Sequence, residues 1–143
     1  MNNWLLLVYK VPREPSLHRV SIWRKLKQLG AVLLQDAVWV LPATPQSREQ
    51  FQWLASEIDE LGGEATFFVA ELDGQSKNSQ LVKTFSDNVD AAFKQILIQL
   101  KRKTPDLTAL ARKYQSARSQ DYFQSKLANK VRKALLAKGE KSS

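Results

Sequence analysis

Hydrophobic and polar positions along the first third of the chain follow two periods, one typical of strands and one typical of helices. Residues 4–11 are a continuous apolar run that Pro12 stops, which predicts a buried strand. Residues 16–29 then carry apolar side chains at helical spacing. Residues 31–42 predict two strands joined by a tight turn around Asp36, or one long bent strand.

The pattern that follows predicts one more helix and strand, and then a helical extension. Residues 45–61 have the apolar stripe of a helix, with Thr44 or Ser47 as its cap. Residues 64–72 read as the last strand. From residue 81 to residue 100 the apolar side chains step by three or four, which predicts a long helix.

The order β-α-β-β-α-β predicts an α+β fold: a ferredoxin-like antiparallel sheet with helices on one side, followed by an all-helical extension. An open sheet face and the long apolar helix over 81–100 both favour a homodimer. The domain boundaries predicted from the pattern are a ferredoxin-like domain at 1–74, a polar hinge at 75–78, a helical extension at 79–138 and a disordered tail at 139–143. The tryptophans fall on apolar faces and are assigned to the core or a dimer interface: Trp4, Trp23, Trp39 and Trp53.

Composition removes several kinds of chemistry. The chain has no cysteine, which excludes disulfides, thiolate catalysis, cysteine-ligated zinc and iron–sulfur clusters. Its single histidine, His18, excludes a histidine metal cluster and a hydrolase triad of the usual form. The apolar and charged fractions, 43% and 25%, are those of ordinary globular domains. No targeting or membrane-spanning segment is visible, so we expect a cytoplasmic protein.

The formal net charge of +8 is unevenly distributed along the chain. Residues 1–35 carry +5, residues 36–75 carry −7 and residues 76–143 carry +10. Clustering of this kind is typical of a protein that binds a polyanion. Solvated helix faces produce the same pattern, and that interpretation stays open at this point.

Two strings carry a family resemblance. WLLLVYKVPREPSLHRVSIWRKLKQLGAVLLQDAVWVLP is similar to the N-terminal domain of the ChrB family of chromate-resistance proteins, and LARKYQSARSQDYF resembles the helical segment that follows it in that family. The resemblance covers roughly residues 3–135, and the family's domain is related to the ferredoxin-like domains of Cas2 and of the PaaX repressors. It implies a cytoplasmic transcriptional regulator that binds the promoter DNA of a chromate-efflux operon and releases it when chromate is present. Full-length members carry a further C-terminal domain, so we expect either a stand-alone short member or one domain of a longer protein.

The relation to Cas2 raises a nuclease function, which the residues do not favour. Cas2-type chemistry implies an aspartate at the end of the first strand, where it holds a divalent metal. This chain has Tyr9, Lys10 and Val11 there, and Asp36 belongs to a turn. We therefore expect a protein that is not an enzyme and needs no cofactor or metal, with chromate as a candidate effector only.

A candidate oxyanion site lies where the first strand hands over to the first helix. Free backbone N–H groups at a helix start attract anions, and arginines add charge-assisted contacts. Such a place suits a DNA phosphate or an oxyanion such as chromate. The alternative is that Arg19 pairs with Glu14 or with an acidic C-terminal strand end, and that His18 is simply exposed. The residues predicted for this site are Arg13, Ser16, His18 and Arg19.

Two basic groups are candidate DNA contacts. The first is the outer face of the helix over 16–29, with Arg24, Lys25 and Lys27. The second is a longer array in the helical extension: Arg112, Lys113, Arg118, Lys126, Lys130, Arg132 and Lys133. The sequence therefore predicts a dimeric DNA-binding regulator, and the alternative is a dimerisation or oxyanion-sensing module that does not touch DNA.

Overall fold

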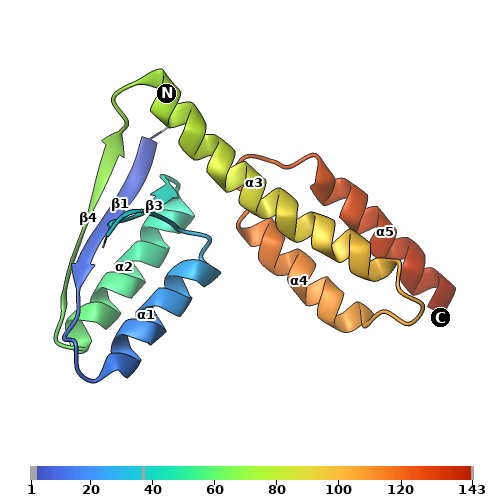
Figure 1. Ribbon diagram of the computed structural model, residues 1–143, viewed down its shortest axis with the longest axis horizontal. Coiled ribbons are helices and arrows are strands. Elements are labelled where there is room, and N and C mark those ends of the chain that lie inside the picture. The colour runs from blue at the N-terminus through green and yellow to red at the C-terminus, as the bar shows by residue number, and fades with distance from the viewer. Residues whose placement is uncertain (1–2, 37, 143) are drawn as a thin grey trace. The chain divides into compact units, whose positions relative to one another are not determined.

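The computed structural model describes residues 3–36 and 38–142, and the chain divides into two compact units (Figure 1). Unit 1 is Met1–Ser79 and unit 2 is Gln80–Ser143. The elements of unit 1 are β1 (Asn3–Lys10), α1 (Ser16–Gln28), β2 (Val32–Gln35), β3 (Val38–Pro42), α2 (Pro45–Glu60) and β4 (Glu64–Glu71). The helix α3 (Gln75–Leu100) begins in unit 1 and continues into unit 2, which also holds α4 (Leu107–Ser119) and α5 (Leu127–Ser142).

The four strands form one antiparallel sheet in the order β2-β3-β1-β4. β1 lies between β3 and β4, so strands flank its apolar run on both sides. Leu7, for example, lies opposite Trp39 of β3 and Phe67 of β4. The α+β class and the antiparallel sheet predicted from the sequence are confirmed. The two strands predicted over residues 31–42 are β2 and β3; Asp36, directly after β2, has a positive φ of 39°, and Ala37 lies outside the described residues.

Both helices of unit 1 pack on the sheet face that Leu7, Trp39 and Phe67 share. The ring of Phe51 on α2 lies edge-on to Phe67, with centroids 6.3 Å apart. Ile22 and Leu26 of α1 are buried as predicted, but Trp23, which the sequence places on the same apolar face, is 50% exposed. On the opposite sheet face, residues such as Val8 and Phe68 stay exposed.

The ends of α2 are tightly specified. Thr44 caps the helix: its side chain accepts from the Ser47 N–H at 3.0 Å, while the Ser47 hydroxyl accepts from the Thr44 N–H at 2.9 Å. This reciprocal pair satisfies two donors of the first turn. Beyond the C-terminus, Gly63 lies against the end of β1, where a Cβ atom would come within 2.3 Å of the Lys10 carbonyl oxygen. Only glycine fits there without movement of the backbone.

The predicted hinge at 75–78 is helical in the structure, which differs from the sequence prediction. Gly74 makes the turn after β4 with a φ of 110°, and α3 starts immediately afterwards at Gln75. Asn78 in the first turn is buried, and its Oδ1 accepts a hydrogen bond from Trp4 Nε1 at 2.9 Å. The polar segment is therefore held to β1, and the boundary of unit 1 falls at Ser79 and not at residue 74.

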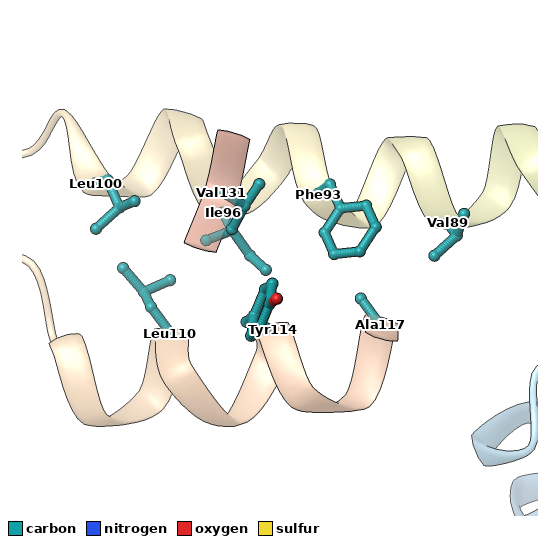
Figure 2. Packing of buried hydrophobic residues seen from close by; sticks show 8 residues of the cluster. All are labelled: Val89, Phe93, Ile96, Leu100, Leu110, Tyr114, Ala117 and Val131. Carbon is teal, nitrogen blue, oxygen red and sulfur yellow. The ribbon is translucent and has the colours of Figure 1, made fainter. Parts of the chain in front are cut away.

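Unit 2 is built around one apolar cluster. The stripe predicted on α3 is buried, with Val89, Phe93, Ile96 and Leu100 facing α4 (Figure 2). Leu110, Tyr114 and Ala117 of α4 complete the opposite wall, and Val131 comes from α5. The stripe of α3 is thus covered within the unit, so this helix does not offer a long apolar face to a second copy.

The end of one helix of unit 2 also differs from the prediction, whereas the start of α4 has a regular cap. Asp106 directly precedes α4, and its side chain caps the helix by accepting from the Ala109 N–H at 3.1 Å. The predicted disordered tail at 139–143 is helical up to Ser142, while residue 143 lies outside the described residues. Lys138, Glu140 and Lys141 are good helix formers, which favours continuation of α5 through this segment.

Candidate functional site

A pocket of about 660 Å³ opens where β1, α1 and the β2–β3 hairpin meet. β1 ends at Lys10 and α1 starts at Ser16, so the end of the strand and the first turns of the helix border the same space. Six of the eleven residues that line it are apolar or aromatic. We call this space the β1–α1 pocket.

The structure brings together three of the four residues predicted to bind an oxyanion. Arg13, Ser16 and Arg19 line the β1–α1 pocket, and His18 does not. Ser16 and Arg19 are three residues apart and so lie on one face of α1, whereas His18 is turned aside and half-buried. This difference between His18 and the other two residues follows from helical spacing and could have been predicted from the sequence.

The aromatic wall of the pocket was not predicted as part of a site. It consists of Tyr9 from β1, Trp23 from α1 and Trp39 from β3. Trp39 is buried, as the sequence predicted, but Trp23 is 50% exposed. Burial raises the pKa of the Tyr9 hydroxyl, against the smaller lowering effects of a hydrogen bond from Trp39 and the positive charge of Arg19. The phenol is therefore neutral at physiological pH and adds a polar contact without a charge.

Charges at the pocket are mostly positive. Lys10 pairs with Glu64 at 3.6 Å, with both side chains exposed. Asp36 lines the side formed by the hairpin. Within residues 3–36 and 38–142, neither Arg13 nor Arg19 has a carboxylate at ion-pair distance, so the predicted pairing of Arg19 with Glu14 is not formed.

The outer face of α1 is less available to DNA than the sequence suggested. Lys25 forms an ion pair with Glu57 of α2. Lys27 lies over the ring of Trp23, with Nζ 5.8 Å from the ring centroid, which is cation–π distance. Arg24 is exposed. Two of the three cations thus make contacts within unit 1.

The net charge of the protein belongs almost entirely to unit 2. Unit 1 carries eight Lys and Arg against nine Asp and Glu, whereas unit 2 carries fourteen against five. All seven basic residues predicted as DNA contacts in the helical extension are exposed. A protein surface with this imbalance attracts polyanions through its long-range field.

Three of these seven residues line a second hollow, of about 300 Å³, between α4 and α5. Arg118 lies at the end of α4, Lys126 precedes α5, and Arg132 lies one turn into α5. We call this space the α4–α5 pocket. Arg132 Nε donates to Asn129 Oδ1 at 3.3 Å, which holds its side chain at the rim. Arg112, Lys113, Lys130 and Lys133 do not line it.

The loop that positions Lys126 is held by carboxylates. Asp121 accepts from the Ser125 N–H at 2.8 Å, and the Ser125 hydroxyl donates to Asp90 on α3. The same hydroxyl accepts from the Leu127 N–H at 3.1 Å, at the start of α5. Gln124 in this loop has a positive φ of 56°. The α4–α5 pocket therefore has a defined floor rather than a chance grouping of long side chains.

Two features are absent from the part of the chain that the structure describes. Nowhere in 3–36 and 38–142 do three His, Asp or Glu side chains come together in a way that would hold a metal ion. In the same part of the chain, no helix combines the length and the apolar character needed to cross a membrane.

The two units define a small α+β domain joined to a basic three-helix unit. Comparison with known proteins identifies the family of this chain. A family model described as "Protein ChrB, N-terminal" matches residues 19–113, and the chain belongs to this family. Over 54 residues it is 43% identical to a protein of Cupriavidus metallidurans named "Protein ChrB", a stretch that covers 38% of this chain and 17% of that protein. The family resemblance drawn from the sequence is thereby confirmed.

Proposed function

We propose that the chain is a DNA-binding regulatory domain of a chromate-resistance system, and that unit 2 makes the contact with DNA. Membership of the ChrB family supports the association with chromate resistance. The observation that carries the DNA assignment is the convergence of Arg118, Lys126 and Arg132 on one pocket in a unit with fourteen cations against five carboxylates. Lys and Arg side chains that neutralise phosphates supply most of the affinity in such contacts.

The test is the salt dependence of binding to a promoter duplex. For the wild-type chain, the logarithm of the association constant should fall linearly with the logarithm of salt concentration, by about 0.9 per phosphate contacted. The triple variant Arg118→Gln, Lys126→Gln, Arg132→Gln should lower that slope by roughly 2 to 3. A control with the same charge change but outside the candidate sets is Arg48→Gln, Lys77→Gln, Lys94→Gln. Equal slopes for both triple variants would contradict the assignment to the α4–α5 pocket.

We further propose that unit 1 is ferredoxin-like and that the chain acts as a cytoplasmic homodimer without enzymatic activity. The first is supported by the β-α-β-β-α-β order, with β1 between β3 and β4 and both helices on one face. The homodimer is supported by the exposed apolar side chains Val8 and Phe68 on the sheet face opposite α1 and α2. Sedimentation of wild type and Phe68→Lys tests it: a dimer that becomes a monomer is the expected result, and a monomeric wild type at high protein concentration contradicts it.

The alternative is a module that senses an oxyanion and does not touch DNA. The gathering of Arg13, Ser16 and Arg19 in the β1–α1 pocket favours an anion site in unit 1. Calorimetry with chromate and with sulfate tests this alternative directly. Heat with chromate that is lost in Arg13→Ala, Arg19→Ala, together with no DNA binding at low salt, would favour it over the regulator.

A further inference from the structure

We propose that the β1–α1 pocket binds a small planar aromatic carboxylate. This inference does not depend on DNA binding, because every residue it uses lies in unit 1. It rests on the pairing of an aromatic wall with two arginines that have no carboxylate partner at ion-pair distance in the described part of the chain.

The walls of the pocket suit a flat apolar body. Tyr9 and Trp39 come from neighbouring strands, and Trp23 faces the same hollow from α1. Val20 and Leu33, which also line it, are both more than 40% exposed. Large apolar side chains left in contact with water around a concave space are typical of a ligand site, because a ligand removes that surface from water. An aromatic ring adds stacking with the indole and phenol rings.

The charges suit a carboxylate at one end of that body. Arg13 comes from the loop after β1 and Arg19 from the first turn of α1, so the two cations approach from different elements. A guanidinium group is a planar fork of donors that matches the two oxygens of a carboxylate. The Ser16 hydroxyl on the same helix face offers a neutral donor. Lys10 contributes less, because Glu64 already lies 3.6 Å from its ammonium group.

A bare tetrahedral oxyanion fits this lining poorly. Such an ion needs hydrogen-bond donors on several sides, and burial beside apolar groups costs it hydration without compensation. More than half of the lining residues are apolar or aromatic, and the histidine predicted as a further donor is not among them. A pocket of about 660 Å³ lies within the range that holds a compact organic molecule. A lining that combines apolar and aromatic side chains with arginines therefore favours an organic anion as the ligand.

Titration calorimetry of the full chain with 2-naphthoate tests the proposal. We expect saturable binding, about tenfold tighter than that of cyclohexanecarboxylate, which has the same charge but no aromatic ring. Saturation-transfer NMR should show contact at the ring protons of the ligand. The same titration with sodium chromate tests a bare oxyanion as the ligand, and the titration with adenosine monophosphate tests a nucleotide.

Two variants with matched controls locate the binding. Trp23→Ala and Arg19→Gln should each weaken 2-naphthoate binding by about tenfold. Trp53→Ala removes a tryptophan that is 73% exposed on α2 and does not line the pocket, and Arg48→Gln removes an exposed arginine from the same helix. Both controls should bind like wild type. Unchanged far-UV circular dichroism in all four variants ensures that the comparison concerns folded protein.

Several results would overturn the proposal. No 2-naphthoate binding up to about 10 mM is one of them, because weaker affinities carry no specificity. Equal affinity for cyclohexanecarboxylate, or tighter binding of chromate or of the nucleotide, would remove the aromatic carboxylate as the ligand class. Binding that survives in Trp23→Ala and Arg19→Gln would place the ligand elsewhere. None of these results depends on whether the chain binds DNA, so the two proposals fail separately.

Discussion

Replacement of Phe93 by alanine should unfold unit 2 selectively. Phe93 is fully buried in the middle of the α3 stripe, and its ring lies 6.1 Å from that of Tyr114, at 44° to it. Val89 and Ile96 stand one turn to either side and are themselves buried, so the surrounding helix has little room to collapse into the cavity. Phe→Ala changes in such positions cost about 3–5 kcal/mol, and loss of the ring pair favours the upper half of that range.

Urea denaturation with two probes measures this loss. Far-UV circular dichroism reports the helices of both units, whereas tryptophan fluorescence reports unit 1 alone, because all four tryptophans lie between residues 4 and 53. With an m value of about 1 kcal/mol/M for a unit of this size, the dichroism midpoint assigned to unit 2 should fall by about 3 M or more. The fluorescence midpoint should stay where it is.

A matched control and a milder variant keep this prediction testable. Ile98→Ala changes the same helix at a side chain that is 54% exposed, and it should alter stability by no more than about 0.5 kcal/mol. Phe93→Leu retains part of the volume and should cost roughly 1–2 kcal/mol, which keeps the unit measurable if alanine unfolds it outright. A dichroism shift for Phe93→Ala that is no larger than that for Ile98→Ala would refute the burial argument.

Three further predictions concern single positions. Thr44→Ala removes the reciprocal cap of α2 and should lower stability by about 1 kcal/mol in urea denaturation, with an unchanged midpoint arguing against the cap. Gly63→Ala should destabilise by about 1–3 kcal/mol because its Cβ meets the Lys10 carbonyl, whereas Gly139→Ala meets nothing and should gain up to about 1 kcal/mol; effects of the same sign would contradict this contrast. Burial raises the pKa of Tyr122 from 10.0 to about 12, so its contribution to stability is complete below pH 10 and is lost as the pH rises from 10 towards 12, because the unfolded chain ionises first. Tyr122→Phe should therefore lose less stability than wild type between about pH 10 and pH 12, and identical losses would refute the shift.

The elements that could be predicted from the sequence are those whose own pattern of apolar residues indicates which face is buried. The apolar run of β1 and the stripe of α3 contain the periodicity that their neighbours impose, so both appeared at the right places. The segment 75–78 was not predicted as helix, because its composition is polar. The contact that holds it is long-range: Asn78 is buried and accepts a hydrogen bond from Trp4, which lies 74 residues earlier on β1. No local pattern carries that information.

The same distinction applies to the candidate site: local spacing predicts some of its residues, and the others depend on tertiary contacts. The helical spacing of Ser16, Arg19 and Trp23 was available in the sequence and places all three on one side of α1. The contribution of Tyr9 and Trp39 required the register of β1 against β3, which the sequence does not specify. The pairing of Lys25 with Glu57 likewise depends on how α1 and α2 lie across the sheet, so a cation assigned to DNA proved to be tied to the neighbouring helix.

Gly63 connects two parts of unit 1 that look unrelated in the sequence. A Cβ atom at position 63 would come within 2.3 Å of the Lys10 carbonyl oxygen and 3.0 Å of the Val11 side chain, and these same two residues form part of the lining of the β1–α1 pocket. A larger side chain at position 63 would push that wall from behind. A genetic screen for variants with altered ligand binding at the β1–α1 pocket should therefore recover changes at this glycine alongside changes at the arginines, although Gly63 is not among the residues that line the pocket. In an engineered sensor, substitutions at position 63 would change the shape of the pocket while leaving the residues that line it unchanged.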